Sequence, residues 1–168
     1  ARVGCMPSKL LIAAAEAAHS IEMAPAFGVH SSKPVIDGKA VMARVKSERD
    51  RFAGFVVEAV DGIPDEDKIR GYAKFLDANR VQIDDDTIIT AKRFVIATGS
   101  RPSYPGVFNN FGDKLIINDD VFNWDDLPES VAVFGPGVIG LEIGQALSRL
   151  GVNVKLFGVD GEIGPLTD

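Results

Sequence analysis

The stretch VAVFGPGVIGLEIGQALSRLGVNVKLF, residues 131–157, contains an apolar run, a glycine turn, an amphipathic segment and a second apolar run. This order predicts a strand over residues 131–134, a helix over about 138–150 and a strand over 152–157. A strand, a crossover helix and a second strand form a βαβ unit. Because a parallel sheet needs more than two strands, we expect this unit to open an α/β domain that continues beyond the chain.

The glycine turn, GPGVIG, fits the pattern G-x-G-x-x-G with a predicted strand before it and a predicted helix after it. Gly135 is expected to make the tight turn, Gly137 to leave room for a pyrophosphate, and Gly140 to let the helix lie close to the strand. Free N–H groups at Val138 and Ile139, where the helix begins, would attract phosphates. The turn predicts a dinucleotide site; a turn that serves packing alone is the alternative.

The second strand of this unit ends at Phe157, near the place where a ribose-binding carboxylate is expected. Gly158 occupies that place, Asp160 follows two residues later, and no arginine is near to bind a 2′-phosphate. The lack of positive charge favours NAD as the nucleotide and does not exclude NADP.

Helical patterns dominate the first third of the chain. A run rich in alanine and leucine predicts a helix from Pro7 or Ser8 to about Ala24. A second helix is predicted over residues 38–60. Its apolar stripe is expected to consist of Val41, Val45, Phe52, Phe55, Val56 and Ala59.

Short β patterns follow between residues 69 and 98. The runs GYAKFL, RVQI and TIIT predict a small antiparallel meander, and RFVIAT, residues 93–98, predicts one further, nearly all-apolar strand. Residues 101–128 have the composition of a long connecting segment. We therefore expect a domain boundary near Leu127 and Pro128.

The composition limits the classes of partner. Lys and Arg total 18 against 24 Asp and Glu, for a net charge of −6, and no basic run could follow a phosphate backbone, so nucleic acid is not expected. No stretch approaches the roughly 18 apolar residues of a membrane span. A single cysteine provides no internal disulfide framework, which favours a reducing cytoplasm. No metal site is expected.

That single cysteine, Cys5, lies in the turn ARVGCMPSKLL, residues 1–11, where the first helix is expected to begin. Pro7 suits the first helical turn, because its missing N–H is not needed there. A thiolate at a helix N-terminus is stabilised by the helix dipole and by cationic neighbours. The setting therefore favours a reactive thiol over an inert core thiol.

Four motifs, in this order along the chain, resemble those of the pyridine nucleotide-disulfide oxidoreductases, the flavoprotein disulfide reductases of the dihydrolipoamide dehydrogenase type. The turn Gly-Cys-Met-Pro-Ser-Lys resembles the second half of the family's Cys-x4-Cys motif, whose first cysteine would directly precede Ala1. Residues 71–75 resemble the contact with the adenine side of FAD, residues 97–102 the second flavin-domain signature, and residues 135–142 the nucleotide fingerprint.

The resemblance implies roles for individual residues. Cys5 would be the catalytic cysteine next to the flavin, while the cysteine before Ala1 would exchange with substrate. Lys9 would lie near the flavin N5 atom and pair with Glu142. The other contacts with FAD would come from Gly71, Ala73, Thr98, Gly99 and Ser100.

The resemblance also implies an architecture. Residues 1–128 would form a Rossmann-like, three-layer FAD-binding domain with an antiparallel β-meander, lacking its N-terminal βαβ unit. Residues 129–168 would open a second Rossmann-like domain, which binds NAD(P). The whole enzyme, a homodimer, would pass electrons from dihydrolipoamide or a lipoyl-protein dithiol to the cysteine pair, to FAD and then to NAD, and the chain alone would be catalytically incomplete.

Other functions stay open at this point. The same scaffold serves flavin-dependent transhydrogenases and mercuric reductases, and a residue other than cysteine before Ala1 would exclude disulfide chemistry. A non-enzymatic nucleotide-binding module is an alternative of another class. It predicts neither flavin absorbance nor diaphorase activity.

Overall fold

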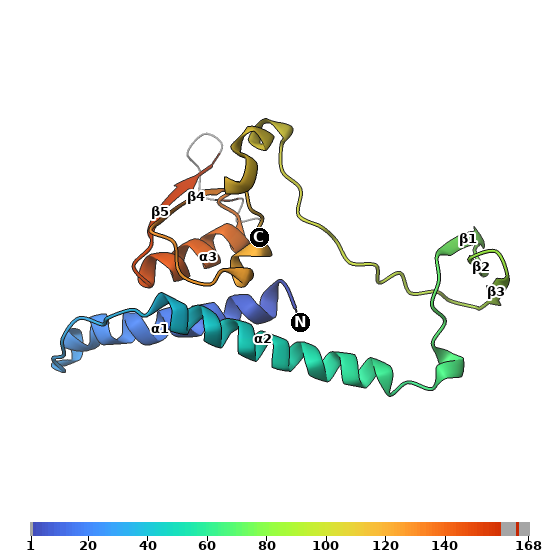
Figure 1. The fold of residues 1–168 in the computed structure, drawn as a ribbon, viewed down its shortest axis with the longest axis horizontal. Coiled ribbons are helices and arrows are strands. Elements are labelled where there is room, and N and C mark those ends of the chain that lie inside the picture. The colour runs from blue at the N-terminus through green and yellow to red at the C-terminus, as the bar shows by residue number, and fades with distance from the viewer. Residues whose placement is uncertain (1, 159–163, 165–168) are drawn as a thin grey trace. The chain divides into compact units, whose positions relative to one another are not determined.

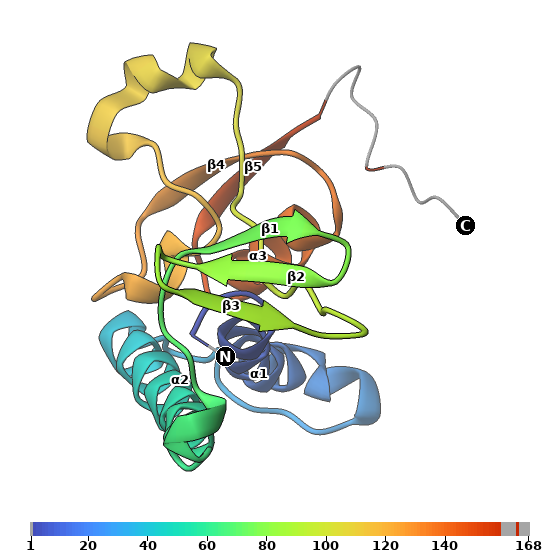
Figure 2. The same cartoon turned by 90° about the vertical axis from the view of Figure 1, so that its right-hand side faces the viewer.

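The computed structural model describes residues 2–158 and 164, and its contacts divide the chain into two compact units. Unit 1 comprises the described residues up to Val56 and from Tyr104 onward, and unit 2 comprises Val57–Ser103. Figures 1 and 2 show the helices and strands of both units.

Helix α1 of unit 1 spans Cys5–Met23 and begins two residues before the predicted start at Pro7. Gly4 precedes the helix with φ +77°, a left-handed conformation that glycine adopts without strain. The N–H of Ser8 donates to the carbonyl of Gly4 (3.3 Å), so Pro7 falls in the first turn, where its missing N–H is not needed. The 3-10 helix η1, Ala24–Phe27, follows α1.

Helix α2 spans Gly38–Asp61, close to the predicted range. The carboxylate of Asp37 accepts a hydrogen bond from the N–H of Ala40 (3.0 Å) and so caps the start of the helix. No helix among the described residues, this longest one included, is apolar enough over a sufficient length to cross a membrane.

The apolar stripe predicted for α2 is wrong in part. Of the predicted stripe, Val45 is buried, whereas Phe55 and Val56 are about half exposed and Ala59 is exposed. The buried residues of the helix are Met42, Val45, Arg49 and Ala53. These four positions also recur at helical spacing, so two overlapping faces fit the sequence pattern. The face that is buried is the one that α2 turns toward the other helices of unit 1.

Arg49 is a charged residue on that buried face, and its guanidinium has partners there. It donates to the carbonyl of Phe122 and to Oδ1 of Asn123, each at 2.9 Å. Both acceptors belong to the 3-10 helix η4, Asp120–Asn123, which follows the longer 3-10 helix η3, Gly106–Lys114. The predicted connecting segment is therefore held to α2 by a buried cation whose hydrogen bonds compensate its burial.

The predicted βαβ unit is present. It consists of β4, Ser130–Phe134, α3, Val138–Arg149, and β5, Asn153–Phe157. The two strands pair in parallel along their whole length, from Ser130 opposite Asn153 to Phe134 opposite Phe157.

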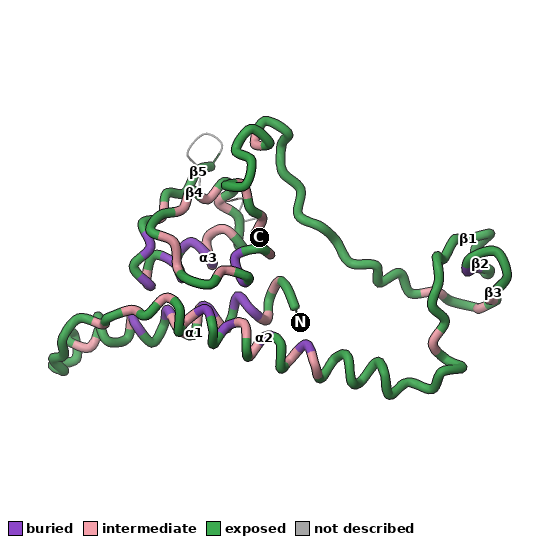
Figure 3. The backbone as a smooth tube through the Cα atoms, viewed as in Figure 1, coloured by how far each residue is buried: buried purple, intermediate pink, exposed green. Residues whose placement is uncertain are grey.

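The core of unit 1 consists of apolar side chains from α1, α2, η4 and the βαβ unit. Its large members, Leu11, Met42, Phe122 and Leu147, are at most 1% exposed. Figure 3 colours the buried positions of α1, α2 and α3 purple. Because each such side chain contributes roughly 1.5–3 kcal/mol on burial, this shared core fixes α1 against α3.

Unit 2 contains the 3-10 helix η2, Asp65–Asp67, and the predicted antiparallel meander. Its strands are β1, Ala73–Asp77, β2, Arg80–Ile83, and β3, Thr87–Thr90. The predicted strand over residues 93–98 is wrong, since that run has no regular secondary structure. A strand needs a hydrogen-bonded neighbour, and no strand in the described part of the chain pairs with it.

Candidate functional site

The glycine turn between β4 and α3 is the first element of the candidate site. Gly135 has φ +110°, which favours glycine, and its N–H donates to the carbonyl of Phe157 (3.0 Å), which extends the contact between the strands. A Cβ added to Gly140 would overlap the carbonyl oxygen of Gly135 and lie 3.3 Å from Cγ1 of Val133. Only glycine at position 140 lets α3 lie this close to β4.

Gly137, in contrast, faces open space. It precedes α3 with φ −77° and ψ −179°, and a Cβ added there would meet no described atom within 4 Å. The same holds for Gly135. Within the described residues no side chain caps the start of α3, at Val138 and Ile139. Open glycine backbone beside an uncapped helix N-terminus fits the pyrophosphate of a dinucleotide.

The thiol of Cys5 is the second element. Cys5 is the first residue of α1 and is exposed, and among the described residues no side chain caps this helix start. Ser8, which is buried, donates from Oγ to the carbonyl of Cys5 (3.1 Å). A buried serine therefore secures the first turn of α1 while the thiol stays accessible.

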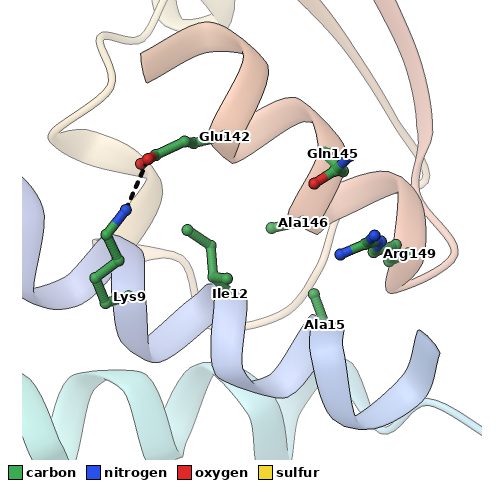
Figure 4. Close-up of a pocket in the computed structure, with 7 residues that line it drawn as sticks. All are labelled: Lys9, Ile12, Ala15, Glu142, Gln145, Ala146 and Arg149. Carbon is green, nitrogen blue, oxygen red and sulfur yellow. Dashed lines mark hydrogen bonds and ion pairs between the residues drawn. The ribbon is translucent and has the colours of Figure 1, made fainter. Parts of the chain in front are cut away.

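Lys9, one turn after Cys5, joins the two elements. Its Nζ donates to Oε1 of Glu142 in α3 at 2.7 Å (Figure 4), so the expected ion pair is present. The side chains are 59% and 38% exposed, so hydration leaves the pair a small share of the stability. Its structural effect is to connect the helix that begins at Cys5 with the helix that begins at the glycine turn.

A cleft of about 220 Å³ lies between α1 and α3 beside this ion pair (Figure 4). Its lining consists of Lys9, Ile12, Ala15, Glu142, Gln145, Ala146 and Arg149. Arg149 of α3 forms a second ion pair with Glu16 of α1. Neither residue belongs to a motif that the sequence analysis identified. The sequence does hold a signal for it, because Glu16 follows Lys9 by seven residues and Arg149 follows Glu142 by seven, a spacing that returns to the same helix face.

The predicted FAD contacts Gly71 and Ala73 lie in unit 2. A Cβ added to Gly71 would overlap the carboxylate of Asp84 and the side chain of Ile83. The N–H of Tyr72 donates to Oδ1 of Asp84 (2.8 Å), and its carbonyl accepts from the N–H of Asp84 (3.0 Å). Packing alone thus explains a glycine at position 71. The sequence motif by itself does not show whether this glycine serves packing or contacts a cofactor. Ala73 is exposed at the start of β1.

Thr98, Gly99 and Ser100 lie in the irregular segment that ends unit 2, and all three are exposed. Gly99 has φ +74° with open space where a Cβ would be, so its backbone conformation favours glycine. Within unit 1 the structure joins the predicted site residues Lys9 and Glu142 directly, and the predicted FAD contacts Gly71, Ala73, Thr98, Gly99 and Ser100 all belong to unit 2. Gly158 directly follows β5, and Asp160 lies outside the described residues.

Residues 1–167 match the sequence model of a family described as "Pyridine nucleotide-disulphide oxidoreductase". The chain is 34% identical over 167 residues to dihydrolipoyl dehydrogenase from Thermus scotoductus and 33% identical over 171 residues to that from Geobacillus stearothermophilus. It is 30% identical over 160 residues to mercuric reductase from Lysinibacillus sphaericus. These matches cover 99%, 96% and 92% of this chain but 35%, 34% and 28% of the relatives. The chain thus spans about a third of the length of the curated relatives it matches.

Solved structures share the fold. The HOCl-induced flavoprotein disulfide reductase RclA from Escherichia coli matches with a TM-score of 0.74 at 18% identity, over 99% of this chain and 35% of that chain. LpdA from Mycobacterium tuberculosis matches with a TM-score of 0.72 at 24% identity, over 99% of this chain and 37% of that chain. The predicted fold class, a Rossmann-like α/β segment with an antiparallel meander, is confirmed.

Proposed function

The chain belongs to the pyridine nucleotide-disulphide oxidoreductase family, and we propose that it is part of an FAD-dependent enzyme that oxidises a dithiol, dihydrolipoamide or a lipoyl protein, with NAD. One observation carries the proposal. The helix that begins with an exposed cysteine lies beside the helix that begins at an open glycine turn, and Lys9 and Glu142 join them at 2.7 Å. In the proposed enzyme this contact would hold the helix with the thiol beside the helix that begins at the nucleotide site.

In this proposal residues 1–128 belong to an FAD-binding domain and residues 129–168 open an NAD(P)-binding domain. The contact between α1 and α3 is then a contact between domains of one enzyme, and Cys5 is the catalytic thiol. NAD is held by Gly135, Gly137, Val138, Ile139 and Gly140, and FAD by Lys9, Gly71, Ala73, Thr98, Gly99 and Ser100.

The proposed reaction is a balanced two-electron transfer. The dithiol loses two electrons and two protons and becomes a disulfide. NAD⁺ takes both electrons and one proton, and the second proton goes to solvent. FAD, when bound, supplies the redox group between the thiols and the nucleotide. The residues of this chain present the Cys5 thiol, leave the backbone at Gly137 open to phosphate, and link the two helices through Lys9 and Glu142.

We assign the whole enzyme to the cytoplasm as a homodimer that binds neither nucleic acid nor membranes. The net charge of −6 supports the first exclusion, because a phosphate backbone would be repelled. A second candidate substrate is Hg²⁺, favoured by the 30% identity to a protein named mercuric reductase. Transhydrogenation between nucleotides is the alternative that needs no thiol.

Replacement of Cys5 tests the thiol chemistry. In the whole enzyme, Cys5→Ser should abolish NAD-linked oxidation of dihydrolipoamide, because the thiolate is lost. FAD absorbance and some diaphorase activity should remain, because the serine is nearly isosteric. Normal dithiol turnover in this variant would contradict the proposal. A wild-type enzyme that reduces Hg²⁺ but does not oxidise dihydrolipoamide would favour the second candidate.

Replacement of Gly137 tests the nucleotide site. Gly137→Ala places a methyl group in open space, so the fold should survive while the KM for NAD rises about tenfold, because the pyrophosphate can no longer approach the backbone. Gly54→Ala is the matched control, since an added Cβ on α2 also meets nothing within 4 Å. Equal KM values for NAD in Gly137→Ala and Gly54→Ala would show that the nucleotide does not bind at this glycine turn.

A further inference from the structure

Two ion pairs, not one, connect α1 with α3. Besides Lys9–Glu142, Nη1 of Arg149 donates to Oε1 of Glu16. Within each helix the two paired residues are seven positions apart, so α1 and α3 run in the same direction, and the pairs are separated by about 10 Å along the helices. Figure 4 shows Lys9 facing Glu142 at one end of the cleft and Arg149 at the other end.

The two pairs have opposite polarity. On α1 the cation comes first and the anion second, whereas on α3 the anion comes first and the cation second. A slip of α3 by seven residues in one direction would set Glu142 beside Glu16. A slip in the other direction would set Arg149 beside Lys9. Only the observed register places opposite charges at both ends of the contact.

Between the two ion pairs, the surfaces of α1 and α3 that line the cleft carry mainly small apolar side chains. The cleft is lined there by Ala15 and Ala146, whose short side chains interlock weakly, and by Ile12. Small side chains permit close approach of two helices without fixing their axial position. The charges therefore contribute to the axial position of α3 on α1, together with Leu11 and Leu147, the large buried side chains of the shared core.

We propose that Glu16 and Arg149 are positioning residues, which hold α3 in the register that the Lys9–Glu142 pair requires. The inference rests on the proposed function, in which α1 carries the catalytic thiol and α3 begins at the nucleotide site. The Arg149 and Glu16 side chains are 23% and 53% exposed, so the pair acts on register more than on stability.

Charge reversal tests the register in the whole enzyme. Arg149→Glu sets two carboxylates against each other, as Glu16→Arg sets two cations, whereas the double variant E16R/R149E restores attraction. Each single reversal should lower kcat with NAD about tenfold and leave the KM for NAD unchanged, because the glycine turn is intact. The double variant should return kcat to within about twofold of wild type. A merely structural role would raise the KM or lower the folded fraction instead.

A second readout does not require activity. Loss of the register frees Lys9 from Glu142, so an amine-reactive reagent should label Lys9 about threefold faster in Arg149→Glu than in wild type, as measured by mass spectrometry. The double variant should label at the wild-type rate. Arg149→Gln, which removes the attraction without adding repulsion, should show an intermediate rate and covers the case in which the reversal prevents folding.

The matched control lies on α2, where Arg51 pairs with Glu48 at 2.6 Å within a single helix. Arg51→Glu should change neither the labelling of Lys9 nor kcat. Lys9 labelling that is equal in wild type, Arg149→Glu and Arg149→Gln would overturn the inference, as would failure of the double variant to restore it. Absence of NAD-linked turnover in wild type would overturn the proposed function instead, and the labelling would still decide the register.

Discussion

Units 1 and 2 differ in how far their apolar residues are buried. In unit 1, helices from distant parts of the sequence bury a shared core that includes Leu11, Met42 and Phe122. In unit 2, Val81 and Ile83 are the buried apolar residues, and Val95 and Ile96 are 91% and 72% exposed. Within unit 2 itself, the three-stranded sheet has no second layer to pack against. The comparison shows that similar hydrophobicity yields a core only where a second element covers it.

The largest expected effect on stability comes from Phe122→Ala, which removes one of the largest fully buried side chains of unit 1. It should lower the free energy of unfolding by about 3–5 kcal/mol, since it leaves a cavity in a closed core. Urea unfolding followed by the fluorescence of Trp124, the only tryptophan, reports on this unit. Phe55→Ala, on the exposed face of α2, should change the free energy of unfolding by no more than about 0.5 kcal/mol.

The counterpart in unit 2 is Ile83→Ala, measured by amide hydrogen exchange in β1 and β2. Its effect should be smaller than that of Phe122→Ala, because its site already borders solvent and can relax. A loss in unit 2 as large as that in unit 1 would show that unit 2 has a closed core after all.

An intermediate effect is expected from the arginines. Arg49→Met keeps most of the side-chain volume but leaves the acceptors on Phe122 and Asn123 without their donor, at a cost of about 1.5–3 kcal/mol in the free energy of unfolding. Arg80→Met in unit 2 removes an exposed pair with Asp77 and should cause no measurable loss. Urea unfolding measures the loss of stability in Arg49→Met, and hydrogen exchange in β1 and β2 measures it in Arg80→Met. Equal losses of free energy in the two variants would contradict this difference between the units.

The smallest expected effect is on acid sensitivity, where the two units should behave alike. The hydrogen bond from Lys46 holds the pKa of Asp125 in unit 1 below its usual range, and the N–H of Asn79, followed by Arg80, does the same to the pKa of Asp77 in unit 2. Because these pKa values are lower in the folded state, the stabilisation is present above the unfolded pKa and is lost as the pH falls through the folded pKa.

Urea midpoints measured from about pH 5 down to about pH 3 should therefore decline, and less steeply in Lys46→Gln than in wild type. The Asp125 side chain is 97% exposed, so the difference should be small. An unchanged pH profile in Lys46→Gln would show that the Asp125 pair contributes nothing.

Much of the fold follows from local sequence. The glycine turn, the strands beside it and helix α3 were predictable because glycine, apolar runs and helical periodicity act within a few residues. The ion pair between Lys9 and Glu142 was also expected, through the resemblance of two motifs that lie far apart in the sequence. The helix start at Cys5 was missed by two residues, because Gly4 allows the helix to begin before Pro7.

The sequence by itself therefore determined the order of the helices and of the paired strands, the glycine turn before α3 and the place of Cys5 near the start of a helix. Only the tertiary structure decided that Met42 and Arg49, rather than Phe55 and Val56, face the core, that residues 93–98 form no strand, and that Glu16 meets Arg149. The physical reason is that periodicity fixes which residues share a face of an element, whereas burial and pairing depend on which other element covers that face.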